Sequence, residues 1–551
     1  MKIGILIKNF KLLGNWELRI IDEIIKSPHL ELVLLIQDGR KGYDSPKSLK
    51  AKLRRLFKSR NLIGTLLFNL QLKVEIKLFK KKLTVNKSKI IEELNKVNKI
   101  GVKPLRKGYL DIFDKNSVKE IEKYDLDIIL RHEFNIIRGE LLNVPKYGIW
   151  SFHHADNSIN RGGPPGFWEI VFNQSSVGVT LQKLTPELDG GLVIDKAFYN
   201  PHWSVIKTSQ DIYEGSVSLL FKNIRKLRYD KFNPKSSELY FNPLYKVPKL
   251  GFVLKYLFNF YFKITHKILQ IINYRIFGTR YNCWTLFIGK GSFLDSTLYR
   301  LKPVKMPRNE FWADPFIFKH KDKNYIFFEN YDYKTKKGKI SCGRIKNSQL
   351  VDVDDVIEKE YHMSYPFIFK ENEDVFLIPE TSENNRLEIY KCVDFPFNWE
   401  LHSTVFEGEK IIDASVYICK NKNKWLFLNK SAGINAPDNS DLYIYKVNSP
   451  DFKELEPHKN NPVIINSKVA RNGGGIFEYK NETYRPSQAN IDGIYGRGLN
   501  INKIKKLTIN EYVEETIITT QPNFDKGLIS MHHLHQSNDI FVIDAAYRKK
   551  Y

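Results

Sequence analysis

The sequence changes character near residue 280, and this change limits the folds that the chain can adopt. Before this point, short apolar runs alternate with helical patterns: Lys2–Ile7, then a helical pattern over 16–25, then Glu31–Ile36. Such a βαβ beginning predicts a parallel, doubly wound sheet. After it, strand-like runs follow one another with polar turns and without a helical pattern of comparable length. We therefore predict a multidomain chain, with an α/β part followed by an all-β part.

Domain boundaries are expected where these patterns change. Residues 1–230 are predicted to form a Rossmann-like α/β domain, closed by a helix over 209–227. A Lys- and Arg-rich stretch at about 40–110 is interpreted as a helical insertion with a basic face. Residues 231–280 are the expected linker. Residues 281–551 have room for five four-stranded blades of a β-propeller at roughly 50 residues a blade, with two packed β-sandwiches as the competing architecture.

The linker contains apolar residues at helical spacing between 248 and 278, with Lys255, Lys263 and Lys267 between them. An interfacial amphipathic helix would have this pattern if it touched a membrane that carries a lipid-linked substrate. A helix buried against one of the two domains would have the same pattern. We favour the buried helix, because apolar stripes usually pack inside a protein.

Composition narrows the choice of partner and compartment. Lys and Arg number 87 against 62 Asp and Glu, a net charge of +25, which favours phosphorylated substrates, an anionic membrane face or nucleic acid. The cysteines lie far apart without metal-ligand spacing, so we expect no metal site and a reducing, cytoplasmic location. The first apolar run is too short for a signal peptide, and we expect no transmembrane helix. The four cysteines are Cys283, Cys342, Cys392 and Cys419.

A histidine, a Gly/Pro-rich loop and a later aspartate come together in the sequence between residues 148 and 194. Transfer of an acyl group to an amine needs a base for the ammonium proton and a donor near the developing oxyanion. His153 and Asp189 could supply the acid–base part, since the pKa of histidine lies near operating pH. This segment therefore predicts an acyl-transfer site.

The same segment resembles the formyltransferases that use 10-formyltetrahydrofolate, which include methionyl-tRNA formyltransferases and sugar N-formyltransferases. The family pattern is Asn-x-His, Arg-Gly-x-x-Pro, Gly-Val-Thr and Leu-Asp-x-Gly, and its pieces occur here in the same order except that Ser151 stands in place of the asparagine. The resemblance implies that His153 and Asp189 are catalytic and that 10-formyltetrahydrofolate is the cofactor. The residues expected to bind substrate are His154, Arg161, Gly162 and Pro165.

Ser151 departs from this pattern, because it occupies the place of the family's asparagine. That asparagine is understood to hydrogen-bond the formyl oxygen as charge develops on it. A serine hydroxyl is shorter and donates one proton, so the oxyanion site is expected to be weakened or rebuilt, with His154 as a neighbour that could compensate. Altered acyl or glycosyl chemistry and an inactive scaffold remain alternatives.

In the second half, carboxylates recur beside aromatic or proline residues. Asp314 follows Trp312, Glu380 follows Pro379, and Asp413 follows Ile412. The innermost strands of a propeller converge on its channel, so one carboxylate per blade would meet the others at one mouth. Glycosyl chemistry uses such a set, with one group ionised, one protonated and one that tunes its neighbour. The alternative is that these residues only cap turns.

This half resembles the propeller domain of plant glucosamine inositolphosphorylceramide transferases and, distantly, five-bladed glycoside hydrolases of the arabinanase and xylosidase type. The resemblance rests on ordered segments that include 312–316, 362–367 and 470–474. It implies a base-like role for Asp314, with Glu380 and Asp413 as candidates for acid and modulator. The candidates for binding saccharide or phosphate are His362, Arg471, Arg485 and Gln488.

Together these features predict a carbohydrate-active transferase of surface-polysaccharide biosynthesis. The first domain would formylate a nucleotide-linked or lipid-linked amino sugar, and the propeller would bind or process saccharide. Residues 248–278 could provide a peripheral membrane contact at the inner membrane face. One alternative is a glycosyltransferase or glycosidase-like enzyme in the propeller beside a non-formylating first domain. Another is a saccharide-binding protein without activity. A tRNA formyltransferase is disfavoured, because a propeller replaces its short basic C-terminal domain, so we expect no specific nucleic acid.

Overall fold

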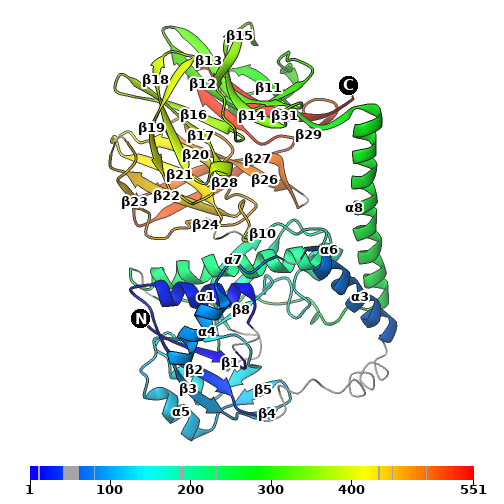
Figure 1. The fold of residues 1–551 in the computed structure, drawn as a ribbon, viewed down its shortest axis with the longest axis vertical. Coiled ribbons are helices and arrows are strands. Elements are labelled where there is room, and N and C mark those ends of the chain that lie inside the picture. Colours follow the sequence, from blue (N-terminus) through cyan, green and yellow to red (C-terminus); the bar gives the residue numbers. More distant parts are fainter. Residues whose placement is uncertain are drawn as a thin grey trace. The chain divides into compact units, whose positions relative to one another are not determined.

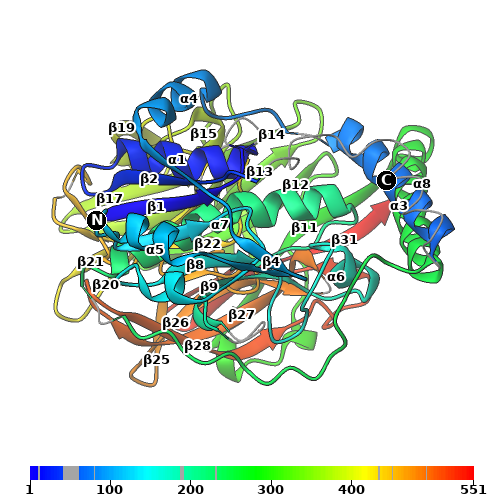
Figure 2. The same ribbon diagram turned by 90° about the horizontal axis from the view of Figure 1, so that it is seen from below.

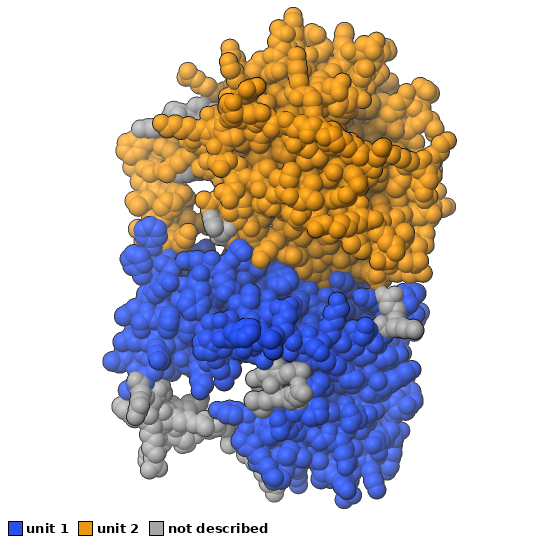
Figure 3. Space-filling model, turned by 180° about the vertical axis from the view of Figure 1, so that it is seen from behind, with its two compact units in different colours: residues 1–262, 432–437 blue, residues 263–431, 438–551 orange. Residues whose placement is uncertain are grey.

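The computed structural model describes residues 1–9, 13–40, 61–79, 81–186, 191–229, 232–431, 433, 435–449, 451–491 and 493–550. The chain divides into two compact units, coloured separately in Figure 3. Unit 1 contains residues 1–262 and 432–437, and unit 2 contains residues 263–431 and 438–551.

Unit 1 is built around a seven-stranded sheet of order β10-β9-β8-β6-β1-β2-β3, visible in Figures 1 and 2. Strands β8, β6, β1, β2 and β3 run parallel, whereas β9 pairs antiparallel with β8 and with β10. The central strands are buried apolar runs, as expected for a sheet covered on both faces. The strands are β1 (Lys2–Ile7), β2 (Glu31–Asp38), β3 (Asn98–Val102), β6 (Ile128–Arg131), β8 (Ile149–His153), β9 (Val177–Lys183) and β10 (Leu192–Tyr199). The predicted α/β first part is confirmed.

Helices and a small second sheet complete unit 1. The small sheet has the order β4-β5-β7. Strand β3, inside the stretch expected to be an insertion, pairs with β2 and so belongs to the main sheet. The helices are α1 (Asn15–Lys26), α3 (Leu62–Phe79), α4 (Lys87–Lys96), α5 (Lys115–Glu122), α6 (Phe167–Val171) and α7 (Val205–Lys226); the strands of the small sheet are β4 (Leu105–Lys107), β5 (Leu110–Ile112) and β7 (Ile136–Arg138).

Helix α8 (Leu250–Phe277) covers the pattern that predicted a linker helix. Its buried residues are Val253, Tyr256 and Phe260, all in its first half. The favoured interpretation, a helix buried against one of the two domains, therefore fits the first half of α8 but not its second half. The physical reason is that apolar residues occur all around the helix, so one packing face cannot cover them. Among the described helices, none combines the length and the apolar character needed to cross a bilayer.

Among its described residues, unit 2 contains five antiparallel sheets, and the predicted β-rich second part is confirmed. The first sheet pairs the first strand of the unit, β11 (Thr279–Lys290), with its last, β31 (Ile540–Lys550), together with β29 (Leu528–Ser530) and β30 (Leu534–Ser537). The other four follow in sequence order. They are β12 (Glu310–His320), β13 (Lys323–Asp332), β14 (Lys337–Lys346) and β15 (Gln349–Ile357); β16 (Ser364–Glu371), β17 (Asp374–Glu380), β18 (Leu387–Asp394) and β19 (Asn398–Val405); β20 (Ile411–Ile418), β21 (Lys424–Lys430), β22 (Asp441–Val447), β23 (Leu455–Pro457) and β24 (Ile464–Ile465); and β25 (Phe477–Tyr479), β26 (Glu482–Ile491), β27 (Ile494–Leu507) and β28 (Tyr512–Thr520).

A buried ion pair joins α1 to α7 in unit 1 and provides a test of the fold. Arg19 Nη1 donates to Glu214 Oε2 at 2.7 Å, and both residues are buried. We expect Glu214→Ala to lower the free energy of unfolding by about 3–5 kcal/mol, because it leaves a buried guanidinium without its nearest carboxylate. Urea denaturation followed by circular dichroism measures this. The control is Asp22→Ala, which removes the partner of the exposed Lys26 and should cost below about 1 kcal/mol.

Candidate functional site

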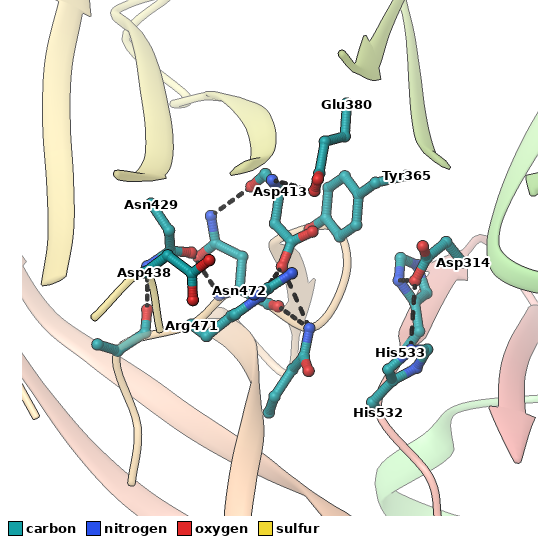
Figure 4. Close-up of polar contacts among 12 residues, drawn as sticks. Asp314, Tyr365, Glu380, Asp413, Asn429, Asp438, Arg471, Asn472, His532 and His533 are labelled. Atoms are coloured by element: carbon teal, nitrogen blue, oxygen red, sulfur yellow. Dashed lines mark hydrogen bonds and ion pairs between the residues drawn. The ribbon is translucent and has the colours of Figure 1, made fainter. Parts of the chain in front are cut away.

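Three successive sheets of unit 2 carry the same irregularity in their first strand. In each of β12, β16 and β20, two residues of the first strand lie opposite a single residue of the second strand, which is a β-bulge. The residues inside these bulges have left-handed backbone: Asp314 at φ 50°, Tyr365 at φ 46° and Asp413 at φ 46°. A bulge re-aims a side chain, and a left-handed non-glycine residue costs roughly 1–3 kcal/mol, a strain that typically persists at functional sites. These three side chains therefore mark the candidate site, shown in Figure 4.

Asp314 lies beside a pair of histidines that follow β29. His533 Nδ1 is 3.5 Å and His532 Nε2 is 3.9 Å from Asp314 Oδ1. Burial opposes ionisation of Asp314, but the hydrogen bond from His533 and the charge of His532 outweigh it, so its pKa lies below the usual value. For His532, burial favours the neutral ring, yet Asp544 at 2.8 Å raises the pKa to about 9.

A divalent cation could be held by ligand atoms of three residues of this group: Asp314, His532 and Asp544. One ligand atom from each lies within 4.8 Å of the others. Asp544 already accepts hydrogen bonds from the backbone, since its Oδ2 accepts the backbone N–H of Asp314 at 3.1 Å and its Oδ1 accepts the backbone N–H of His533 at 2.9 Å.

Asp413 is held by a second group of polar side chains. Arg471 Nε donates to Asp413 Oδ2 at 2.6 Å, and Gln488 Nε2 donates to the same oxygen at 3.2 Å. Glu380 Oε2 accepts the Asp413 N–H at 3.3 Å. Burial and the neighbouring Glu380 and Asp314 carboxylates raise the pKa of Asp413 well above its usual value, against the opposing effect of Arg471. In Figure 4, Tyr365 is drawn between this group and the Asp314 group.

Glu329, at the end of the buried part of β13, is a further acidic residue of this site. It is 7% exposed, and His362 Nε2 lies 3.4 Å from its Oε1. Burial, and then the negative charges of Asp314 and Glu380, raise its pKa well above the usual value. The site thus contains a carboxyl group that favours the ionised form, Asp314, and two whose pKa values are raised toward the protonated form, Glu329 and Asp413. Such a division assigns base and acid roles in a shared site.

Most of the residues predicted from the sequence of this half lie together. Asp314, Glu380, Asp413, Arg471 and Gln488 belong to one network of contacts and charges. His362 is at the edge of the group, where its Nδ1 accepts the Gly338 N–H.

Arg485 lies behind this network. It is fully buried, and its guanidinium pairs with Glu514 and with the carbonyl of Val469. Another of its hydrogen bonds goes to Asn472 Oδ1, so it supports the loop that carries Arg471.

Sequence reasoning missed several members of the site. One signal was available: Tyr365-Pro-Phe-Ile-Phe repeats Asp314-Pro-Phe-Ile-Phe, which makes Tyr365 the equivalent of Asp314. A second was the run of three histidines within 532–535. Glu329 and Asp544 had no local signal, because each ends an ordinary apolar strand run. The missed residues are Glu329, Tyr365, Asn472, His532, His533 and Asp544.

The predicted acyl-transfer residues lie at the end of β8 in unit 1. His153 pairs with Thr180 of β9, which brings the Gly-Val-Thr segment beside the histidine. His153 Nε2 is 2.7 Å from the carbonyl oxygen of Asn160; because a carbonyl only accepts, the proton is on Nε2. Asp189 lies outside the described residues. A cavity of about 180 Å³ is lined by His153, Asn157, Arg161, Gly162, Gln182 and Leu244.

The predicted substrate-binding residues of unit 1 lie in the loop that follows β8. A Cβ on Gly162, at φ +123°, would lie 2.0 Å from the carbonyl oxygen of Tyr245, so only glycine fits there. Arg161 Nε donates to the carbonyl of Asn157 at 3.0 Å. Pro165 precedes the N-terminal end of α6. His154 packs against Tyr213, and burial lowers its pKa to about 3, so its ring is neutral.

Ser151 is committed to a neighbouring arginine. Its Oγ accepts from Arg131 Nε at 2.9 Å and Nη2 at 2.8 Å, and its hydroxyl donates to the carbonyl of Phe152 at 3.4 Å. A hydroxyl in this arrangement has no further proton to offer a formyl oxyanion. The described residues therefore do not fit 10-formyltetrahydrofolate chemistry at the donor position that the family resemblance implies.

Comparison with known proteins gives matches for parts of the chain. Residues 300–537 match the family model described as glucosamine inositolphosphorylceramide transferase 1, N-terminal. Glucosamine inositolphosphorylceramide transferase 1 of Oryza sativa subsp. japonica is 32% identical over 212 residues, which are 37% of this chain and 28% of the relative. Methionyl-tRNA formyltransferase of Prochlorococcus marinus is 26% identical over 222 residues, 38% of this chain and 61% of the relative.

Among solved structures, an α-L-arabinofuranosidase from Lactobacillus brevis is similar with a TM-score of 0.33 and 14% identity, over 45% of this chain and 87% of that chain. The predicted resemblance of the C-terminal part to glucosamine inositolphosphorylceramide transferases is confirmed by the family model. The resemblance to formyltransferases is supported at lower identity. The chain spans little more than a quarter of the length of the rice transferase, and both curated relatives are transferases by name.

The raised pKa of His532 predicts a pH dependence of stability. A folded-state pKa of about 9, above the ordinary 6.5, stabilises the fold fully below pH 6.5, and this stabilisation is lost as pH rises through 9. The loss should be on the order of 3 kcal/mol. Urea unfolding of the wild type between pH 6 and pH 10 measures it against Asp544→Asn, in which the decline should be much smaller. An equal decline in both proteins would contradict the pairing of His532 with Asp544.

Proposed function

We propose that unit 2 is a glycosyltransferase that moves an amino sugar from a nucleotide-linked donor to a lipid-linked acceptor bearing phosphate, in surface-polysaccharide biosynthesis. The observation that carries this proposal is the pair of carboxyl groups with opposite preferences, Asp314 ionised and Glu329 protonated, within one buried cluster. The match of residues 300–537 to a sugar-transferase family model supports the choice of transfer over hydrolysis.

The arrangement assigns a role to each charged residue of the site. The oxygen of the acceptor hydroxyl bonds to the anomeric carbon of the sugar, and Asp314 accepts the proton that this hydroxyl loses. The bond from that carbon to the donor phosphate breaks in the same displacement, and Arg471 and the protonated Glu329 stabilise the charge on the leaving phosphate. Asp413 positions Arg471 through their 2.6 Å contact, and Glu380 positions Asp413 through its backbone N–H.

Substitution of the two carboxyl groups tests these roles. Asp314→Asn and Glu329→Gln should each lower kcat by about 10²–10⁴-fold, because the first removes the proton acceptor and the second removes the acidic proton that Glu329 offers to the leaving phosphate. The assay uses the full chain, nucleotide-linked glucosamine or N-acetylglucosamine labelled in the sugar, and an inositol-phosphate lipid. Asp374→Asn, which removes an exposed partner of Lys391, is the matched control and should keep full activity. Unchanged transfer by both site variants would overturn the assignment.

We also infer that the five sheets of unit 2 are the blades of a five-bladed β-propeller over about residues 281–551. Three observations support this inference. The sheets follow one another in sequence; first strands β12, β16 and β20 contact in succession; and β11 pairs with β31, which joins the two ends of the unit. Contacts of β25 with β30 and of β27 with β29 connect the fifth sheet to the first. A cytoplasmic location at the inner membrane face is part of the same proposal.

Formyl transfer by unit 1 is the second candidate function. It is favoured by the cavity that His153 shares with Arg161 and Gly162, and by the similarity to methionyl-tRNA formyltransferases. The cofactor would be 10-formyltetrahydrofolate and the acceptor an amino sugar. Because Ser151 is committed to Arg131, we derive no catalytic step for Ser151.

Mass spectrometry of amino sugars incubated with the chain and 10-formyltetrahydrofolate tests this candidate. If formyl is transferred, His153→Ala should reduce the rate at least 100-fold, because the candidate acid–base group is lost. Ser151→Ala should change it only a few-fold, because the Ser151 hydroxyl is already paired. No mass gain across nucleotide-linked amino sugars would leave unit 1 without this activity. A large loss in Ser151→Ala would contradict the pairing observed here.

A further inference from the structure

Helix α3 buries polar residues and exposes large apolar ones. Its buried residues are Gly64, Phe68, Gln71 and Glu75, a stripe that includes two polar side chains. Its outward residues are large and apolar, whereas a surface helix of a globular protein ordinarily shows the opposite pattern. The exposed apolar residues of α3 are Ile63, Leu66, Leu70, Val74, Ile76 and Leu78, from 37% to 61% exposed.

Glu75 fixes this orientation. Its side chain is fully buried, and Oε2 accepts from Ser204 Oγ at 2.6 Å and from the Ile206 N–H at 3.1 Å at the start of α7. Its Oε1 accepts from Tyr256 Oη of α8 at 2.5 Å and from Gln71 Nε2 at 3.0 Å. Rotating α3 to bury its apolar stripe would break the three bonds to Ser204, Ile206 and Tyr256 and leave these buried donors unpaired, which is costly. The apolar stripe therefore stays outside.

The first half of α8 lies beside α3, as Figure 1 shows. Asn61 Nδ2 donates to the carbonyl of Pro248 at 2.7 Å, and Tyr261 Oη donates to Gln71 Oε1 at 3.1 Å. This part of α8 also exposes large apolar side chains. Together with those of α3 they form what we name the α3–α8 face: Ile63, Leu66, Leu70, Val74, Ile76, Leu78, Leu254, Phe258, Tyr261 and Phe262.

Charge around this face has one sign. Glu75 is the one acidic residue in the sequences of α3 and α8, and it is buried, whereas Lys73, Lys77 and Lys255 are exposed. Apolar side chains bordered by cations suit the headgroup region of an anionic bilayer, where the chains enter the acyl boundary and the lysines meet phosphates. A second copy of this chain would bring the same positive charges to the contact.

We propose that the α3–α8 face docks unit 1 on an anionic lipid bilayer surface. This goes beyond the expected contact through residues 248–278, because it makes α3 a principal contact helix. It rests on the proposed function in one respect, that a lipid-linked acceptor would be met at the same surface.

Sedimentation of the full chain with lipid vesicles tests the proposal. The wild type should bind vesicles of phosphatidylcholine and phosphatidylglycerol at least tenfold more tightly than vesicles of phosphatidylcholine alone. The combined variant Leu66→Gln, Leu70→Gln, Val74→Gln should lose at least tenfold in affinity for the mixed vesicles, and Lys73→Ser with Lys77→Ser should lose the preference for phosphatidylglycerol. The matched control is Leu239→Gln with Phe241→Gln, which changes exposed apolar residues of unit 1 outside the face.

Two results would overturn the proposal. One is equal binding of wild type and the α3 variant to mixed vesicles. The other is a wild type that does not bind vesicles but dissociates from dimer to monomer when the α3 residues are changed, which would make a second copy the occupant. Folding of the α3 variant is checked by sugar transfer to a soluble acceptor. Asp314→Asn should still bind vesicles, so failure of the proposed catalysis and failure of docking give different results.

Discussion

Several carboxyl groups are buried close together in unit 2, and the rest of the candidate site is organised by this constraint. Four carboxyl groups are each less than a tenth exposed: Asp314, Glu329, Asp413 and Asp544. The negative charges of the three aspartates raise the pKa of Glu329. Like charges at such burial cannot all be ionised unless cations accompany them. Arg471 and His532 supply two positive charges, and the pKa values of Glu329 and Asp413 are raised, so the negative charge of the cluster is reduced.

The backbone carries part of this arrangement. Left-handed residues inside bulges of three successive first strands turn Asp314, Tyr365 and Asp413 toward a common region, at a local cost in backbone strain. Packing of large apolar residues on either side of each bulge offsets that cost, and fully buried Arg485 supports the neighbouring loop from behind. A regular strand would place the same side chains in the alternation of the pleat, without this convergence.

In unit 1, by contrast, a buried carboxylate is stabilised by neutral hydrogen-bond donors. Glu75 satisfies its charge with four neutral donors from three helices, and thereby fixes which side of α3 faces outward. Ser151 shows the same dependence on a partner from another strand: its hydroxyl looks available in the sequence, but Arg131 of β6 occupies it. In both cases the partner that decides the role is far away along the chain.

The sequence alone determined the elements, because burial on one or both faces imposes a periodicity that can be read locally. Strand β1 coincides with its predicted run, the α/β and β-rich parts are where the patterns placed them, and Asp314, Glu380 and Asp413 are individually visible beside proline and aromatic residues. Only the tertiary structure decided the chemistry at these positions. Glu329 and Asp544 lie inside ordinary strands. The sequence pattern of α8 reads as that of a buried helix, and Ser151 reads as a free hydroxyl. Charge state, solvent exposure and hydrogen-bond commitment each depend on neighbours that the fold brings from distant segments, and no local pattern contains them.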